Sequence, residues 1–289
     1  MHTFVVNRIV RNLVRRALRE DLGIRGDITS QATIPAGYKS TAVIVAKASG
    51  IVAGQPVAQE VFRTLDKKLQ YERVVPDSQR VETGQTIAEL RGSTRSILAG
   101  ERTALNILGR MSGIATLTGQ FVEAVAGSGI KISETRKTAP GLRYLDKAAV
   151  RIGGGVNHRY ALYDAFLIKE NHIAAAGDIV KAIHACQDFR IGKTKRRFKV
   201  MVEVRNLEEF RLAQSAHPDR IMLDNFTSEG IVECLKYRLD GVEIEASGGI
   251  NLQNISEFVK TCVNYISLGM LTHSVKNLDL SLLIQSNKG

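Results

Sequence analysis

The chain has 289 residues, of which 44% are hydrophobic and 24% are charged, as is typical of a folded protein with one large domain or two smaller ones. Its formal net charge of +11 is typical of proteins that bind nucleic acid, acidic membrane surfaces or small polyanions. Only 6% of the residues are aromatic and none is tryptophan, which argues against nucleic-acid binding through stacking, and no apolar run is long enough to span a membrane.

The first nineteen residues contain five arginines and no acidic residue, a composition that a transit peptide would also have. Apolar residues nevertheless recur there at helical spacing: Val10, Leu13, Val14, Ala17 and Leu18. This stripe predicts a native first helix with one face in the core. The pattern continues into EDLGIRGDITS without a break that would be typical of a cleavage site.

Residues 41–92 predict short strands and one helix. The stretch TAVIVAKASGIVAG predicts a strand and a tight turn, PVAQEVFRTL (56–65) predicts a helix, and residues 69–92 predict further strands with turns between them. Residues 95–125 predict a long apolar helix that Gly109 and Gly113 interrupt.

From residue 130 onward, short apolar runs alternate with helical stretches. The six runs are IKIS, AFLIKENH, KVMVEV, RIMLDN, VEIEASGG and YISLG. Buried strands that alternate with helices predict βα units and a parallel sheet. Because no dinucleotide-binding fingerprint follows the first strand, the pattern favours a (β/α) barrel over a doubly wound sheet. It leaves open whether the barrel closes.

Polar residues and glycines recur at the carboxyl ends of these runs, where α/β barrels carry their reactive groups. They are Glu134, Arg136, Lys137, Lys169, Asn171, His172, Glu203, Asp224, Asn225, Glu245, Ser247, Gly248, Gly249, Ser267 and Gly269. Each alone has a structural alternative: Lys169 as a strand-end lysine, Asp224 and Asn225 as helix caps, the glycines as tight turns. Their recurrence at one structural position is what predicts a site.

Two kinds of ligand fit these strand ends. Glycine-rich turns that open a helix bind phosphate through backbone N–H groups, and ASGGIN and SLG follow consecutive strands. Glu203 and Asp224 would bind sugar hydroxyls, or a Mg²⁺ that phosphates bring in.

Residues 136–169 contain seven cations and two acidic residues. We expect Arg143 and Lys147 on solvated helix faces, and the basic segment KTKRRFK (193–199) in a solvated loop. The other cations suit a small molecule with several carboxylates or phosphates.

The three cysteines, Cys186, Cys234 and Cys262, are far apart in the sequence. Their spacing matches no zinc motif, and an odd number cannot be fully paired in disulfides. We therefore expect a reducing, cytoplasmic compartment.

The sequence resembles the nicotinate-nucleotide pyrophosphorylases, the carboxylating enzymes that are also called quinolinate phosphoribosyltransferases. The resemblance covers nearly the whole chain, in the blocks EDLGIRGDITS, RSILAGERTALNILGRMSGIAT, ETRKTAPGLR, AVRIGGGVNHRYALYDAFLIKENHI, EVRNLEE, IMLDNF, EASGGI and ISLGMLTHS. Several of these blocks are long, so the resemblance is specific.

This resemblance implies an α/β protein with the type II phosphoribosyltransferase fold. An N-terminal α/β sandwich domain (1–112) would precede an incomplete (β/α) barrel (113–274), and the C-terminal tail (275–289) would return to the first domain. It also implies a homodimer, which a hexamer could contain, with Arg102 completing the site of the neighbouring subunit.

The resemblance also implies the site residues. Quinolinate and a phosphate would be bound by Arg102, Thr135, Arg136, Lys137, His158, Arg159 and Lys169. The ribose and Mg²⁺ end of phosphoribosyl pyrophosphate (PRPP) would be held by Glu203 and Asp224. Its 5′-phosphate would be cradled by Ser247, Gly248, Gly249, Ser267, Leu268 and Gly269. Catalytic roles would fall to Lys137, Glu203 and Asp224.

Two residues depart from the family pattern. Glu134 stands where an aspartate is more usual, and Arg205 stands where an acidic residue is common. Period-two alternation places Arg205 on the same strand face as Glu203, which puts the geometry of the metal end in question.

The implied activity is that of a pentosyltransferase in de novo NAD biosynthesis, which converts quinolinate and PRPP into nicotinate mononucleotide, pyrophosphate and CO2. One alternative is a related phosphoribosyltransferase that acts on another acid such as nicotinate, or a molybdenum-associated homologue. The density of cations and the NHR motif favour quinolinate. A basic nucleic-acid-binding or scaffold protein with a decayed enzyme fold is a second alternative, but it should have lost some of the strand-end residues.

Overall fold

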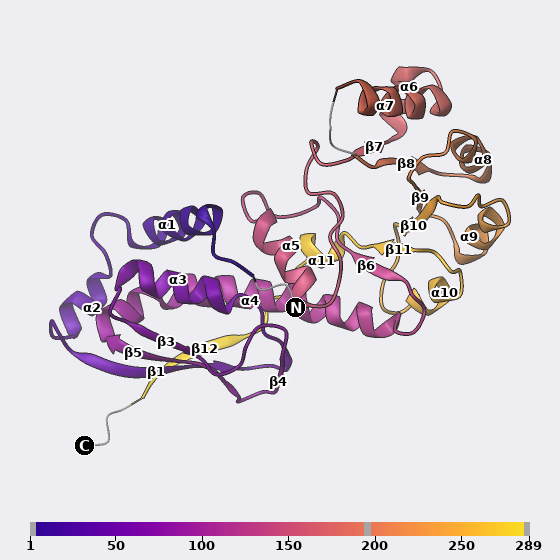
Figure 1. Ribbon diagram of the computed structural model, residues 1–289. Helices are drawn as coiled ribbons and strands as arrows, with labels where there is room; N and C mark the ends of the chain where they lie inside the picture. The colour runs from indigo at the N-terminus through magenta and orange to yellow at the C-terminus, as the bar shows by residue number, and fades with distance from the viewer. Residues whose placement is uncertain (1–3, 194–197, 286–289) are drawn as a thin grey trace. The chain divides into compact units, whose positions relative to one another are not determined.

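The computed structural model describes residues 4–193 and 198–285, so the centre of the basic segment KTKRRFK lies outside the described residues. The chain divides into two compact units (Figure 1). One unit comprises Met1–Gly119, Thr138–Gly154 and Leu271–Gly289, and the other comprises Gln120–Lys137 and Gly155–Met270. The domain boundary between residues 112 and 113 stays a prediction.

The first unit contains an antiparallel sheet with the strand order β12-β1-β5-β3. The strands are β1 (Lys39–Ala46), β3 (Gln70–Arg73), β5 (Thr86–Ser93) and β12 (Leu280–Gln285). A two-stranded sheet pairs β2 (Gly50–Ile51) with β4 (Arg80–Val81). Since β12 pairs with β1, the described end of the chain belongs to the sheet of this unit.

Three helices precede or follow these strands: α1 (Arg8–Leu22), α2 (Ile28–Thr33) and α3 (Gln55–Leu65). The predicted first helix is confirmed, because Val10, Val14 and Leu18 are buried along one face of α1. Asn7 caps its start by accepting a hydrogen bond from the Val10 N–H at 3.1 Å, which satisfies one of the free donors of the first turn.

The long predicted helix is α4 (Thr94–Ala124), and it is continuous. The prediction that Gly109 and Gly113 interrupt it was wrong. Both glycines instead allow the chain near residues 276–278 to approach the helix closely. A Cβ on Gly113 would lie 2.1 Å from the carbonyl oxygen of Lys276, and a Cβ on Gly109 would lie 2.9 Å from that of Leu278.

Helix α5 (Arg143–Ile152) lies in the same unit. The predicted solvated faces were wrong for Lys147, which is buried because α5 is enclosed over six consecutive residues. Arg143 is half-buried, and its Nε donates to Thr138 Oγ1 at 3.0 Å. Asp146 on α5 is fully buried and accepts two hydrogen bonds from Arg110 on α4.

The second unit contains the six predicted strands, all parallel, in the order β6-β11-β10-β9-β8-β7. The strands are β6 (Lys131–Ser133), β7 (Phe166–Ile168), β8 (Val200–Val204), β9 (Arg220–Asp224), β10 (Glu243–Ser247) and β11 (Tyr265–Ser267). The intervening helices are α6 (Glu170–Ala176), α7 (Ile179–Lys193), α8 (Leu207–Ser215), α9 (Ser228–Leu235) and α10 (Ile255–Val259), and α11 (Met270–His273) follows β11. Figure 1 shows α7 to α10 along one side of the sheet.

Within the described residues, β6 and β7 do not pair with each other, so the barrel is incomplete, as predicted. The two faces of the sheet differ in polarity. Val202, Ile221 and Ile244 are in register on one face and are fully buried. The alternate residues, among them Arg220 and Glu245, form a polar interior face. None of the helices in the described ranges is long and apolar enough to cross a membrane.

Candidate active site

The carboxyl ends of the parallel strands bring several predicted residues into register. Ser247 on β10 lies opposite Asp224 on β9 and Ser267 on β11, and Ser267 lies opposite Ser133 on β6. Asn225 continues from Asp224, and its N–H donates to the Ser247 carbonyl at 2.7 Å. The structure therefore places these groups next to one another at the carboxyl ends of the strands, as expected for parallel strands.

The segment after β6 carries the cations of the ETRKT motif. Thr135 Oγ1 accepts a hydrogen bond from the Lys137 N–H at 3.1 Å, which tightens the turn. Lys137 is exposed, and Arg136 is half-buried. The Nε of Arg136 is buried and has no hydrogen-bond partner among the described residues.

Glu134 is fully buried and does not face solvent as its position at a strand end suggested. Its carboxylate accepts hydrogen bonds from the His158 N–H at 3.1 Å and from Asn157 Nδ2 at 2.9 Å. The residue that departs from the family pattern therefore holds the loop that carries two predicted substrate ligands, His158 and Arg159.

The guanidinium groups of Arg136 and Arg159 repel each other. Burial and the nearby charge of Arg136 together lower the pKa of Arg159, and Asp164 offsets only part of this effect. Arg159 Nη1 donates to the Ala165 carbonyl at 3.0 Å, whereas its Nε is buried without a partner in the described part of the chain. Two like charges held together with spare donors are suited to binding an anion.

Lys169, the residue before α6, forms an ion pair with Glu203 on β8. Arg205, which put the metal end in question, has other partners: Glu170 at 2.9 Å and Glu209 at 3.2 Å. Glu170 and Glu209 neutralise the charge of Arg205, so the ion-pair partner of Glu203 is Lys169 and not Arg205.

Asp224 is not a helix cap, so that structural alternative was wrong. The cap of α9 is Thr227, whose side chain accepts from the Gly230 N–H. Asp224 Oδ2 instead accepts a hydrogen bond from Asn225 Nδ2 at 3.0 Å. Asn225 has a left-handed backbone at φ 60°, which asparagine tolerates better than most residues.

Within the described ranges, no cluster of three histidine, cysteine or acidic side chains could hold a metal ion. Mg²⁺ is often bound by one or two carboxylates together with substrate phosphates. Glu203 and Asp224 therefore fit an ion that arrives with a pyrophosphate, and they do not fit a resident metal site.

Gly248 and Gly249 follow Ser247 with positive φ values of 90° and 67°. A Cβ on Gly248 would lie 2.1 Å from Asn225 Oδ1, so this position requires glycine. The turn does not open a helix directly, contrary to the expectation, because α10 begins only at Ile255. After β11, Gly269 does precede α11, but the Leu268 N–H is already donated to the Ser133 carbonyl at 2.8 Å.

Arg102 lies on α4 in the first unit. Its side chain is 65% exposed, and its ion-pair contact in the described structure is Glu101 at 4.0 Å. The guanidinium is thus available for a ligand from outside its own helix.

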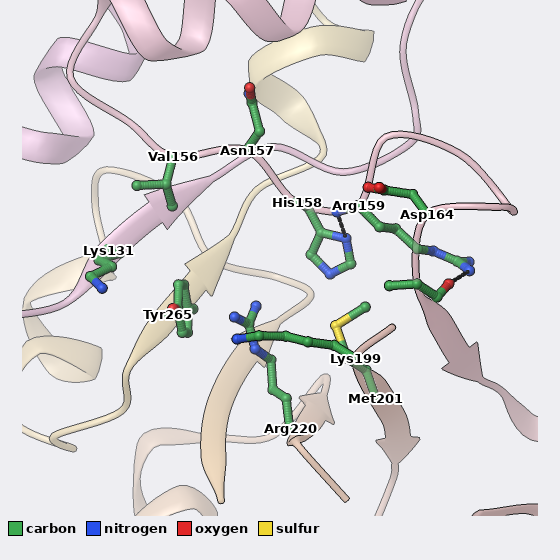
Figure 2. A pocket seen from close by; sticks show the side chains of 11 residues that line it. Lys131, Val156, Asn157, His158, Arg159, Asp164, Lys199, Met201, Arg220 and Tyr265 are labelled. Atoms are coloured by element: carbon green, nitrogen blue, oxygen red, sulfur yellow. Dashed lines mark hydrogen bonds between the residues drawn. The ribbon is translucent and has the colours of Figure 1, made fainter. Parts of the chain in front are cut away.

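A cavity of about 370 Å³ lies in the second unit (Figure 2). Of the predicted site residues, only His158 and Arg159 line it. Its other walls include Lys131, Lys199, Arg220 and Tyr265, at or next to the amino-terminal ends of their strands. These residues are missing from the predicted site, because the polar pattern at the carboxyl ends of the strands gives no signal for the opposite ends.

A polar network lies beside this cavity. Arg220 bonds Glu243 and Glu245, each at 2.8 Å, and its guanidinium stacks 3.6 Å above the Tyr265 ring centre. Burial raises the pKa of Glu243, but hydrogen bonds from Lys199 and Arg220 outweigh burial and lower it to about 2. Period-two alternation of Glu243, Glu245 and Ser247 was the signal in the sequence that could have predicted this network.

Comparison with known families and proteins agrees with this geometry. Residues 27–112 match the N-terminal domain model of quinolinate phosphoribosyl transferase, and residues 114–283 match the C-terminal domain model. The chain belongs to the quinolinate phosphoribosyltransferase family.

Relatives within the quinolinate phosphoribosyltransferase family cover almost the whole chain. A carboxylating nicotinate-nucleotide pyrophosphorylase of Mycobacterium leprae is 42% identical and covers 94% of this chain and 96% of its own. A decarboxylating quinolinate phosphoribosyltransferase of Nicotiana glauca is 41% identical and covers 96% of this chain and 83% of its own. The structure of the Francisella tularensis nicotinate-nucleotide pyrophosphorylase has a TM-score of 0.91, with 42% identity and 98% of both chains covered.

These comparisons confirm four predictions: the family, the α/β fold of the quinolinate phosphoribosyltransferases, the phosphoribosyl transfer of NAD biosynthesis, and the enzyme class. They do not concern individual residues. The roles of the residues, the metal and the assembly are therefore argued from the site itself.

Proposed function

We propose that this chain transfers the phosphoribosyl group of PRPP to quinolinate at the carboxyl ends of β6 to β11, with Arg136 and Arg159 as ligands of the quinolinate carboxylates. The observation that carries this proposal is that both guanidinium groups have a buried Nε donor without a partner in the described structure; burial and the charge of Arg136 also lower the pKa of Arg159. A dicarboxylate between them satisfies both donors and removes the repulsion, because arginine and carboxylate pair through two parallel hydrogen bonds.

Further residues complete the quinolinate end. Lys169 leaves its ion pair with Glu203 to contribute a third cation, and Thr135 and Lys137 follow Arg136 along the same turn. Lys137 is exposed, so we place it against the charge of the pyrophosphate, as a catalytic group. His158 lines the wall of the cavity next to Arg159.

Residues on the four strands that lie between β6 and β7 in the sheet, β8 to β11, bind PRPP. The 5′-phosphate binds at the turns Ser247–Gly249 and Ser267–Gly269, which lie side by side because Ser247 and Ser267 are in register. Glu203 and Asp224 face the ribose. These two carboxylates would hold a Mg²⁺ that arrives with the pyrophosphate, and the ion would supply neutralisation of the charge on the leaving group.

The chemistry requires charge stabilisation more than a general base. When the C1–O bond to pyrophosphate breaks, positive charge develops on the ribose C1, and Glu203 and Asp224 stabilise it. The lone pair of the pyridine nitrogen forms the new bond to C1. The adjacent carboxylate then leaves as CO2, its bonding electrons stay on the ring carbon, and that carbon takes a proton from solvent.

The test is release of labelled CO2 from quinolinate labelled at the carboxylate next to the nitrogen, with PRPP and Mg²⁺ each omitted in turn. Release that needs all components supports the proposal. If the enzyme consumes PRPP with nicotinate but not with quinolinate, nicotinate is its substrate and the alternative phosphoribosyltransferase is favoured. Arg136→Ala should abolish release, whereas Arg151→Ala, an exposed arginine on α5, should not. Equal activity of the two variants would contradict the role of Arg136.

The assembly belongs to the same proposal. Arg102 is exposed on α4, and we place it in the site of the other subunit of a homodimer, with a hexamer as the larger assembly. Arg102→Ala and Arg136→Ala should each be inactive alone. Mixed and refolded together, they should recover about a quarter of wild-type activity, because half of the dimers then contain one intact site. No recovery in mixed dimers would place Arg102 in its own subunit's site.

The compartment is proposed to be the cytoplasm. All three cysteines lie in the described ranges as free thiols, which suits a reducing environment. Fractionation with a cytosolic marker enzyme tests this, and recovery with an oxidising compartment would contradict it.

A further inference from the structure

Two fully buried carboxylates contact the loop that carries His158 and Arg159, although the family resemblance assigned a role to neither. Glu134 follows β6, and Glu245 lies on β10; both are 0% exposed. A buried carboxylate is costly unless it is paired and hydrogen-bonded. The partners of these two groups therefore indicate what the carboxylates are there to hold.

The two nitrogens of the His158 ring face different groups. Nδ1 accepts a hydrogen bond from the Arg159 N–H at 2.8 Å, so the proton of the neutral imidazole is on Nε2. Nε2 lies 3.4 Å from Glu245 Oε1, and the ring is almost completely buried. Figure 2 shows the ring directed into the polar interior, with the hydrogen bond from the Arg159 N–H to its Nδ1 as a dashed line. The Nε2–H therefore faces the Glu245 carboxylate at 3.4 Å, a contact that does not meet hydrogen-bond geometry.

Glu245 is itself held from the amino-terminal side of the sheet. Its other oxygen accepts from Arg220 Nη1 at 2.8 Å, and Arg220 is fixed in turn by Glu243 and by the ring of Tyr265. Burial raises the pKa of Glu245, but the contact with His158 and the charge of Arg220 outweigh it and lower the pKa. An ionised carboxylate in this place favours the Nε2–H tautomer of His158.

The order of contacts along the barrel interior is therefore Arg220, Glu245, His158 and Arg159. The last member, Arg159, has a buried Nε without a partner in the described part of the chain, and the like charge of Arg136 lies nearby. The Glu134 carboxylate holds the same loop independently, by accepting hydrogen bonds from the His158 N–H and from Asn157 Nδ2. A loop fixed at two points by buried carboxylates presents Arg159 in a single orientation, which binding of a rigid dicarboxylate requires.

We propose that Glu245, acting through the His158 imidazole, is a positioning residue that sets the orientation of Arg159, and that His158 itself does not contact quinolinate. This inference rests on the proposed function, in which Arg159 binds a carboxylate of quinolinate. It revises the expectation that His158 is a direct ligand.

Glu245→Gln tests the proposal, with Glu243→Gln as the matched control on the same strand. Both substitutions remove a carboxylate partner of Arg220, but only Glu245 lies against His158. We expect Glu245→Gln to raise the KM for quinolinate by about tenfold or more and to change kcat much less. Glu243→Gln should lose comparable thermal stability and keep the wild-type KM. The same KM in both variants would overturn the proposal.

A second pair of variants does not depend on the folding of Glu245→Gln. His158→Asn keeps an acceptor at the position of Nδ1, and His158→Ala does not. If the ring links the Arg159 N–H to Glu245, His158→Asn keeps the acceptor but loses the contact with Glu245, so it should lose about as much quinolinate affinity as Glu245→Gln, and His158→Ala should lose more. Equal losses in His158→Asn and His158→Ala would mean that the ring contacts the substrate directly, which contradicts the proposal.

The proposed function and the positioning role of Glu245 would fail under different outcomes. Absence of CO2 release by the wild type would contradict the proposed function, and calorimetric titration with quinolinate would still rank the variants. A wild type that releases CO2, with equal quinolinate affinity in Glu245→Gln and Glu243→Gln, would overturn this inference alone.

Discussion

Lys169 and Glu203 form an ion pair across the ends of the neighbouring strands β7 and β8. One partner belongs to the proposed quinolinate end of the site and the other to the ribose end, so the pair joins the two substrate regions. Because the Lys169 side chain is 48% exposed, the pair contributes at most about 1 kcal/mol to stability. Its two charges are therefore available for substrates at little structural cost.

Lys169→Met should therefore weaken quinolinate binding without unfolding the protein. Loss of one charge-assisted hydrogen bond costs about 1.5–3 kcal/mol, which corresponds to about a ten- to hundredfold rise in KM. Steady-state kinetics and thermal unfolding of the variant check this. Lys181 on α7 forms an exposed ion pair with Asp178, which directly precedes this helix. Lys181→Met removes that pair and should change neither the KM for quinolinate nor the thermal stability. A KM unchanged in Lys169→Met would remove this residue from the site.

The Arg110–Asp146 pair should carry much more stability. Asp146 is fully buried, and its two hydrogen bonds from Arg110 measure 2.8 and 2.9 Å. Removing one partner of a buried pair costs about 3–5 kcal/mol, so Arg110→Ala should lower Tm by about 6–12 °C. Arg91→Ala, which breaks an exposed pair with Glu89, should change the free energy of unfolding by less than about 0.5 kcal/mol. Equal Tm values for the two variants would contradict this account.

Gly248→Ala should be more damaging than Gly249→Ala, although both positions have positive φ. A Cβ on Gly248 meets Asn225 Oδ1 at 2.1 Å, whereas a Cβ on Gly249 meets nothing within 4 Å. Left-handed strain alone costs about 1–2 kcal/mol, so the clash should show as a further loss of Tm and a higher KM for PRPP in Gly248→Ala. Adding Asn225→Gly should recover part of the loss. Indistinguishable alanine variants would mean that the Asn225 side chain moves away freely.

Acid should destabilise the protein through Glu243. Its pKa is lowered from 4.5 to about 2, against the effect of burial, by Lys199 and Arg220. Between these two pH values the unfolded chain binds more protons at this group than the folded chain, so stability falls as the pH decreases through this window. Denaturant unfolding at several pH values should show a shallower dependence in Glu243→Gln than in the wild type. Parallel curves would contradict the lowered pKa.

Local patterns were sufficient for most of the fold. The helical stripe of Val10, Val14 and Leu18 predicted α1, and the alternation of apolar runs with helical stretches predicted the parallel sheet, since both reflect which side chains must be buried. The same reasoning failed for Lys147 and for Gly113. Burial of one and the close approach of Lys276 to the other depend on segments distant in sequence.

The sequence by itself determined the family, the reaction class and the strand ends that carry polar groups, because motifs and periodicity are local properties of the chain. Only the tertiary structure decided which charges meet. It directs Arg205 to Glu170 and Glu209, leaves Arg136 beside Arg159, and places Glu245 against the ring of His158. Electrostatic pairing depends on distances of a few ångströms between separate strands and loops, and no spacing along a single strand encodes those distances.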